Sequence, residues 1–271
     1  MPERKLRNCV CHNLRYYPMV QQMRRMREDG DLGKVLVVQG TYSQDWLLYE
    51  TDWNWRIDEK AGGPLRVMAD IGSHWFDMAE HVTGLKVQSM CADLQTFHPT
   101  RKKPKGRVET FASQAGAGNV DDVAVTTDDF GAVVFRMEQE ARGAMTASQM
   151  SAGCKNGFRM EVYGTKASVA WNQERPDELW IGHRDQPNQI VIKDPSLMIE
   201  RARSYADLPG GHSEGYDDTF KQVFRRFYRS IAEPGSAAEY PQLADGLRQM
   251  ILMDAELESH RGRRWVDIAS S

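Results

Sequence analysis

The segment MADIGSHWFDMAEHVTG (68–84) carries the residue types and spacing in this chain that are best suited to chemistry. Asp70, His74, Asp77 and His81 follow one another at intervals of four, three and four residues. In a helix of about 3.6 residues per turn these intervals return to one face, so we predict a helix that presents the four groups in a line. A carboxylate one turn before a histidine is an arrangement suited to proton transfer.

Two other interpretations of this line of ionisable groups stay open. Carboxylates and imidazoles can bind zinc or manganese. Four groups along one straight helical line cannot converge on one ion, however, so we expect no metal site. The groups can also serve only the helix itself, by pairing with neighbours and facing solvent. Spacing alone does not decide between this structural role and a catalytic one.

Motifs for other chemistries are absent or incomplete. A dinucleotide site needs G-x-G-x-x-G between a strand and a helix, and the nearest match, Gly116-Ala-Gly118-Asn-Val-Asp121, lacks the third glycine. Gly210 and Gly211 precede a predicted helix but have the wrong spacing for a nucleotide motif. The chain also has no G-x-S-x-G elbow. The sequence therefore predicts neither a nucleotide-binding half nor a serine hydrolase.

The elements that must position these groups follow from hydrophobic periodicity. An apolar stripe of Ile71, Trp75, Met78 and Val82 lies beside the line of ionisable groups and predicts the core-facing side of their helix. Leu6–Asn13 reads as a short strand. A helix is expected from Pro18 through Glu28, because Pro favours the first turn and Gly30 follows the end.

From Asp121 to Lys193 the pattern is almost wholly β, in short runs separated by turn residues. Such short spacing leaves no room for crossover helices, so we predict a mostly antiparallel sheet. Two amphipathic helices are expected near Ser213–Ala232 and Pro241–Arg261, and a last strand at Arg264–Ile268. Helices before and after a block of strands indicate an α+β fold and not a doubly wound sheet.

Composition limits the class of protein. The chain has 271 residues, 41% hydrophobic and 27% charged, with a net charge of −3, which is typical of a globular protein and gives no footprint for nucleic acid. No apolar run is long enough to span a membrane, and the N-terminus lacks the apolar core of a signal peptide. Four cysteines without a C-x-x-C pair fit reduced thiols, so we expect a cytoplasmic protein. From the net charge and the lack of a long apolar run we expect no nucleic-acid or membrane partner.

Several motifs occur in the order found in one enzyme family. The chain resembles the C-terminal half of the Gfo/Idh/MocA family of NAD(P)-dependent oxidoreductases, which act mostly on sugars, cyclitols and related polyols. The resemblance rests on Leu14-Arg-Tyr-Tyr-Pro18, the Gly30-Asp-Leu-Gly33 turn, Trp55-Arg56 before Gly62-Gly63, Asp70-Ile-Gly-Ser-His74-Trp-Phe-Asp77, and the Phe158–Ala170 hairpin. Singly these motifs are loose, but their order is specific.

The resemblance implies a fold and a chemistry. The fold is an open, mostly antiparallel sheet with helices packed on one face, and the sheet commonly mediates homo-oligomer assembly. In the chemistry, hydride leaves a carbon of a sugar or polyol for the nicotinamide while His74 takes the hydroxyl proton as general base. Asp70 would orient the imidazole of His74 and favour its protonated form.

Side chains near these motifs could bind a polyol by hydrogen bonds and by stacking on its ring. The substrate-binding candidates are Arg15, Tyr17, Asp45, Trp46, Trp55, Arg56 and His212. Arg15 and Arg56 are the stronger of these, whereas His212 can equally be a helix-entry residue.

The chain departs from the family at its start, because family members carry a glycine motif and a Glu-Lys-Pro segment that are not found here. Residues 1–17 would then be the remnant last strand of a dinucleotide-binding domain, and 18–271 the substrate-binding and oligomerisation domain. We accordingly expect a truncated or separately encoded chain that is inactive alone and binds no cofactor by itself. NAD or NADP would be used in a full-length enzyme, with a separate nucleotide-binding chain as a conceivable partner.

Two rival functions remain open on the sequence. One is a non-catalytic sugar-binding or scaffold protein derived from the same family. The other is a metal-dependent hydrolase that uses the carboxylates and histidines of the helix at 68–84.

Overall fold

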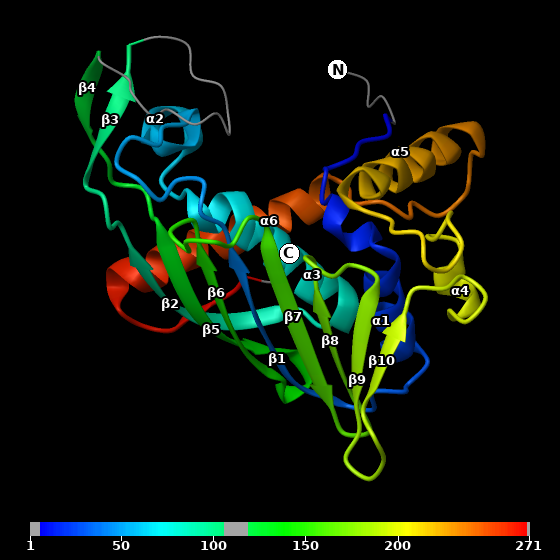
Figure 1. Ribbon diagram of the computed structural model, residues 1–271. Coiled ribbons are helices and arrows are strands. Elements are labelled where there is room, and N and C mark those ends of the chain that lie inside the picture. Colours follow the sequence, from blue (N-terminus) through cyan, green and yellow to red (C-terminus); the bar gives the residue numbers. More distant parts are fainter. Residues whose placement is uncertain (1–5, 106–118, 270–271) are drawn as a thin grey trace.

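The computed structural model describes residues 6–105 and 119–269 (Figure 1). Gly116 and Gly118 of the incomplete glycine motif, and residues 1–5 of the predicted N-terminal remnant, lie outside the described residues.

A nine-stranded sheet dominates the described chain, in the order β10-β9-β8-β7-β1-β6-β5-β2-β11. Neighbouring strands are antiparallel except for the parallel pair β1 and β6, so the prediction of an open, mostly antiparallel sheet is confirmed. A separate two-stranded sheet pairs β3 (Thr100–Pro104) with β4 (Val120–Ala124). The strands of the large sheet are β1 (Val35–Ser43), β2 (Val87–Gln95), β5 (Phe130–Met137), β6 (Arg142–Ser148), β7 (Gly157–Gly164), β8 (Ser168–Asn172), β9 (Glu178–Gly182), β10 (Gln189–Ile192) and β11 (Val266–Asp267).

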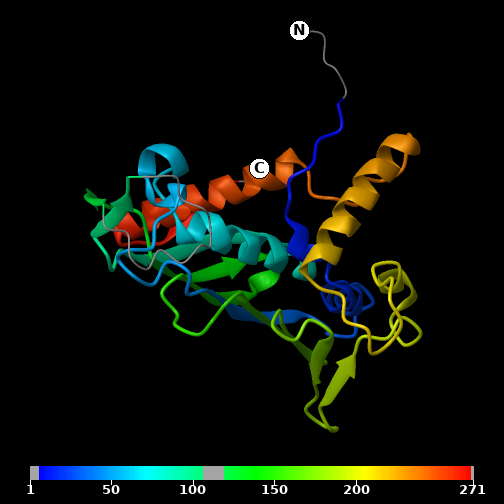
Figure 2. The same ribbon diagram turned by 45° about the horizontal axis from the view of Figure 1, so that its top comes forward.

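Three helices gather on one side of the large sheet (Figure 2). They are α1 (Pro18–Glu28), α3 (Ser73–Thr83) and α6 (Leu243–Gly262), which contact β8, β1 and β2 respectively. A fourth long helix, α5 (Tyr216–Ala232), packs on η1 near the N-terminal segment. The shorter helices are η1 (Asn13–Tyr16), η2 (Trp55–Ile57), α2 (Glu59–Gly62), η3 (Met68–Gly72), η4 (Glu138–Glu140) and α4 (Glu200–Arg203). In the described part of the chain, no helix is both long and apolar enough to cross a membrane.

The predicted strand at Leu6–Asn13 is wrong. Residues 6–12 form no strand, and η1 begins at Asn13. The polar groups of this segment bind the α5–α6 connection instead: the Val10 N–H donates to the Pro241 carbonyl at 2.9 Å, and Asn8 Oδ1 accepts from the Leu243 N–H at 2.8 Å. Residues 6–12 therefore pack on the α5–α6 connection and pair with no strand of the described chain.

The helix that carries Asp70 and His74 is not a regular α-helix. It begins with the π-helical turn η3, in which the Ser73 N–H donates to the carbonyl of Met68, five residues back. It continues as α3 and ends at Gly84, whose φ of 67° is left-handed and favours glycine. Because a π-turn is wider than an α-turn, the expected straight line is broken between Asp70 and His74.

Two points of this helix segment, its start and Trp75, are held by residues of the sheet or directly before it. The Asp128 carboxylate accepts from the N–H groups of Arg66, at 2.5 Å, and Met68, at 2.9 Å, and so satisfies the start of the helix. Further along, the Trp75 indole donates to the Arg159 carbonyl of β7 at 3.0 Å. Trp75 is fully buried, and its approach to β7 passes directly over Gly40 of β1.

Gly40→Ala is expected to lower the free energy of unfolding by about 1–3 kcal/mol, because its Cβ would lie 2.0 Å from the Arg159 carbonyl oxygen. Urea unfolding measures this loss. Gly157→Ala, on the paired strand β7, is the matched control, since its Cβ would meet no atom closer than 3.5 Å. Its unfolding free energy should stay within about 0.5 kcal/mol of the wild type. Equal losses in the two variants would contradict the close approach at Gly40.

Candidate active site

A chain of hydrogen-bonded polar side chains lies beyond the ends of β1 and β6. Ser43 pairs with Ser148 at the last position of these parallel strands, so the next residues, Gln44 and Gln149, emerge at the same edge of the sheet. Gln149 Nε2 donates to Gln44 Oε1 at 3.3 Å and to Asp70 Oδ2 at 2.8 Å. The two strand ends thereby join the helix that carries His74.

The network continues through the amide of Gln44. Its Nε2 donates to Asn156 Oδ1 at 2.9 Å, and its Oε1 accepts from the Trp46 indole at 2.8 Å. The Tyr42 hydroxyl donates to the same Asn156 oxygen at 2.8 Å. Tyr42 is buried, which raises the pKa of its phenol, so this hydroxyl stays protonated as a donor. Amide, hydroxyl and indole groups of this kind are those that bind sugar hydroxyls.

Asp70 faces Arg56 and Gln149. Its Oδ1 lies 3.1 Å from Arg56 Nε, and among the described residues it makes no hydrogen bond to His74. The Arg56 guanidinium also lies 4.7 Å over the Trp55 ring and donates to Asn54 Oδ1 at 3.2 Å. Trp55 itself is exposed. The expectation that Asp70 orients the His74 ring is thus not met by a direct contact, because the π-turn separates their directions.

His74 is half-buried, and its Nδ1 is buried without a hydrogen-bond partner. Burial and, to a smaller extent, the neighbouring His12 lower the pKa of His74 to about 4, while Asp77 acts in the opposite direction. The imidazole is therefore neutral near pH 7. Because Nδ1 is enclosed, a substrate could deliver a proton only to the other ring nitrogen, Nε2, of this neutral imidazole.

Asp77 and His81 pair with neighbouring elements. Arg15 binds Asp77 in a bidentate pair, with Nε and Nη2 at 2.7 and 2.5 Å from the two carboxylate oxygens, and it also reaches Asp245 at 2.9 Å. His81 Nε2 lies 3.1 Å from Gln21 Nε2. The guanidinium of Arg15, a predicted substrate residue, thus binds two carboxylates, one on α3 and one on α6.

The other predicted substrate residues lie in different surroundings. Tyr17 is buried against Trp171, with ring centroids 5.0 Å apart, and burial raises its pKa to about 12. Asp45 accepts from Lys155 Nζ at 2.6 Å and from the Gly153 N–H at 3.0 Å, which fixes the loop after β6. His212 is exposed, and its Nδ1 lies 3.3 Å from the carbonyl of Gly210, outside the polar network.

Sequence reasoning missed several members of the site, namely His12, Tyr42, Gln44, Gln149 and Asn156. Gln44 and Gln149 lie inside the β runs that the sequence predicts at 34–49 and 141–150, so nothing in their spacing indicates that their side chains meet. Their meeting requires the parallel pair β1–β6, and a mostly antiparallel prediction did not contain that pair.

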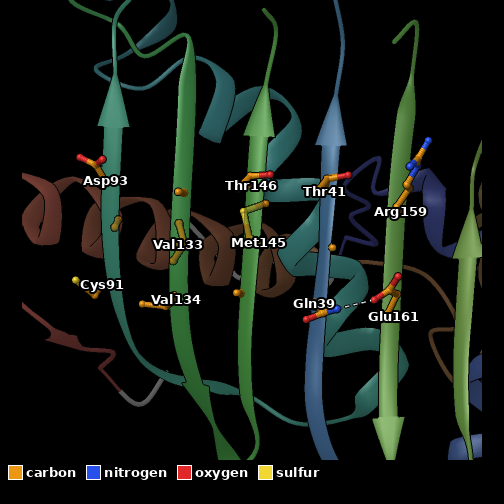
Figure 3. Close-up of a pocket in the computed structure, with 14 residues that line it drawn as sticks. Gln39, Thr41, Cys91, Asp93, Val133, Val134, Met145, Thr146, Arg159 and Glu161 are labelled. Carbon is orange, nitrogen blue, oxygen red and sulfur yellow. Dashed lines mark hydrogen bonds between the residues drawn. The ribbon is translucent and has the colours of Figure 1, made fainter. Parts of the chain in front are cut away.

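A hollow of about 700 Å³ lies on the sheet face that the helices leave open (Figure 3). Its lining from β1, β2, β5, β6 and β7 includes Thr41, Cys91, Val134 and Thr146, and does not include Asp70 or His74. Its charged side chains are Asp93, Arg159 and Glu161, and Glu161 accepts a hydrogen bond of 2.7 Å from Gln39. Within residues 6–105 and 119–269, no group of three or more His, Cys, Asp or Glu side chains could hold a metal ion.

Comparisons with known proteins give a consistent result. A family model described as the GFO/IDH/MocA C-terminal domain matches residues 20–170. Levoglucosan dehydrogenase of Pseudarthrobacter phenanthrenivorans is 28% identical over 98% of this chain and 68% of its own length. The uncharacterised oxidoreductase YfiI of Bacillus subtilis is 25% identical over 92% of this chain, which spans 58% of YfiI. A solved structure of levoglucosan dehydrogenase in complex with NADH and L-sorbose superposes with a TM-score of 0.86 at 27% identity, over 99% of this chain and 68% of that one.

These comparisons correct the expectation of a truncated, inactive domain without a cofactor. Almost the whole chain aligns with oxidoreductases, including a dehydrogenase whose solved complex contains NADH and a sugar. The predictions of a truncated C-terminal domain that is inactive alone and binds no cofactor by itself are accordingly withdrawn. They rested on a missing glycine motif, and the absence of one motif does not determine activity. The chain spans 68% and 58% of the length of levoglucosan dehydrogenase and YfiI, so its activity and its cofactor are taken up below as proposals.

Proposed function

Because the chain belongs to the GFO/IDH/MocA family, we propose that it is an oxidoreductase that transfers hydride between a sugar or polyol and NAD(P). The observation that carries this proposal is the half-buried, neutral His74 ring on the helix segment whose Asp70 binds Arg56 and Gln149. The similarity to a levoglucosan dehydrogenase supports a sugar as substrate.

In this proposal the residues of the chain divide the work between binding and proton transfer. The hydroxyl proton of the sugar passes to Nε2 of the neutral His74 imidazole, because Nδ1 is buried and out of reach of a substrate. Asp70 holds Arg56 and Gln149 in place, and these donors bind neighbouring hydroxyls. Trp46 and the exposed Trp55 supply aromatic surface beside the ring of the sugar.

The cofactor, when bound, accepts the hydride that leaves the carbon of the alcohol. In the part of the chain that the structure describes, no strand leads through a glycine-rich turn into a helix, which is the usual cradle for a dinucleotide diphosphate. The described residues therefore account for the sugar and the proton, and not for the diphosphate of the cofactor. NAD(P) itself is proposed from the NADH complex of the similar dehydrogenase.

The purified full chain tests this function directly. NADH and NADPH are titrated by fluorescence, and reduction of NAD(P)⁺ is followed at about 340 nm with a panel of sugars that includes levoglucosan. We expect saturable binding of one cofactor and sugar-dependent reduction. Absence of both cofactor binding and reduction across the panel would overturn the proposal.

We also propose that a second copy of the chain covers the open sheet face, as the family resemblance implies. Val134 is 46% exposed there, amid small apolar residues of the 700 Å³ hollow. Light scattering of the wild type should give a dimer or larger assembly, and Val134→Lys should give a monomer. Leu197→Lys is the control, because Leu197 is 76% exposed but lies off this face. A monomeric wild type would contradict the proposal.

Finally, we propose a cytoplasmic location. The four cysteines, Cys9, Cys11, Cys91 and Cys154, are all unpaired in the structure, as expected of a reducing compartment.

A further inference from the structure

A second histidine lies against the proposed base. His12, immediately before η1, is 7% exposed, and its ring meets that of His74 edge to face, with centroids 5.2 Å apart and planes at 78°. The chain contributes His12 from a segment more than sixty positions earlier than α3. Its contact with His74 is therefore a product of the tertiary fold and not of helical spacing.

His12 also lies beside the ion pair of Arg15 and Asp77. Its Nδ1 is 3.9 Å from Asp77 Oδ2, which is too far for a direct hydrogen bond, and this nitrogen is buried without a partner. The charged groups that influence His12 are Asp77 on α3, Arg15 on η1 and Asp245 on α6. Arg15 pairs with both carboxylates, so this cluster of one guanidinium and two carboxylates has one negative charge in excess.

We infer that His12 is a positioning residue for His74: its ring fixes the orientation of the base and couples it to the Asp77–Arg15 pair, so that the two imidazoles bind protons as one unit. The inference rests on the proposed function only where it calls His74 the base. It replaces Asp70, which the structure binds to Arg56 and Gln149, as the residue that governs His74.

Electrostatics support this coupling. Burial lowers the pKa of both histidines, and a charge on His12 lowers the pKa of His74 further. Asp77 raises the pKa of each ring, and it is nearer to His12. Two like groups this close titrate in linked steps, because a proton on one ring opposes a proton on the other.

The experiment is an NMR titration of the histidine ring ¹³Cε1 signals in the resting full chain, without sugar or cofactor. The His74 signal is assigned with His74→Gln. His12→Phe keeps an aromatic ring in place but removes the titratable group. We expect the midpoint of His74 to rise in this variant by at least about half a pH unit. Asp70→Asn, the matched control on the same helix segment, should move it by less than about 0.3 units.

The outcomes separate the inference from the proposed function. An unchanged His74 midpoint in His12→Phe, or a larger change in Asp70→Asn, would overturn the coupling to His12. If His12→Phe does not fold, as judged by circular dichroism, His12→Gln takes its place with the same expected direction. Because the titration uses no substrate, it reports on the pair of rings even if sugar oxidation is never observed. In an active enzyme the acid limb of kcat/KM should shift in the same direction as the His74 midpoint.

Discussion

His74→Gln is expected to lower kcat/KM for sugar oxidation by about 10²–10⁴-fold, which is the usual contribution of a positioned general base. Glutamine keeps a polar side chain of similar reach but cannot take up the proton. His74 is half-buried with an unpartnered Nδ1, so the substitution removes no existing hydrogen bond from the resting protein. Steady-state kinetics with the best sugar of the panel measure the loss, which should fall on kcat more than on KM.

His81→Gln is the matched control for this prediction. His81 lies two turns further along the same element, and burial together with nearby arginines lowers its pKa well below the ordinary value. It is neutral, as His74 is, but its Nε2 faces Gln21 and Arg24 instead of the polar network. The kcat/KM of the His81→Gln variant should remain within a few-fold of the wild-type value. Comparable losses in both variants would mean that helix integrity, and not proton transfer, explains the effect of His74→Gln.

The regular elements could be predicted because their sequences agree with their burial. The helix expected from Pro18 to Glu28 is observed with those bounds, and Trp75, Met78 and Val82 of the predicted stripe are buried. The short β runs after Val120 became strands for the same reason, since alternate residues face the core, as in the alternation along β5. Local periodicity is sufficient to predict a helix or strand wherever one of its faces is buried.

The site itself depends on features that periodicity does not contain. The π-turn at Met68–Gly72 has no signature in residue spacing, and it turns Asp70 toward Arg56. The parallel pairing of β1 with β6 brings Gln44 to Gln149 across 105 positions of sequence. His12 was assigned to a strand, although its ring lies against His74. Each of these is a long-range contact or a local irregularity, which a single sequence does not specify.

Arg15 shows how a motif residue can be located correctly and its contacts still be missed. It lies directly before α1, at the motif that the sequence identifies, but the carboxylates of Asp77 and Asp245 bind its guanidinium. A guanidinium held by two carboxylates has few donors left for a sugar. Its contribution to the site is therefore through the position of the helices.

The largest loss of stability is expected from Asp129→Ala, by about 3–5 kcal/mol, because it breaks a buried ion-pair network. Asp129 is fully buried, and its Oδ1 binds both Arg66 and Arg101, the latter at 2.8 Å. Its Oδ2 accepts from the N–H groups of Phe97, at 2.6 Å, and His98, at 3.0 Å. Alanine would leave two buried guanidinium groups without this carboxylate. Burial lowers the pKa of Arg66 to about 9 and that of Arg101 to about 10, so both are still charged at neutral pH.

Urea unfolding at neutral pH measures this loss, and Asp122→Ala is its control. Asp122 pairs with Lys102 at 2.5 Å, but the Asp122 carboxylate is 60% exposed, so removal of this surface pair should cost no more than about 1 kcal/mol. The buried network also reaches the proposed base, because Arg66 Nε donates to the Asp128 carbonyl at 3.1 Å while the Asp128 carboxylate holds the first turn of η3. Asp129→Ala should therefore reduce sugar oxidation at temperatures where the variant is still folded. Equal stability of the two variants would show that the carboxylate of Asp129 is not what balances Arg66 and Arg101.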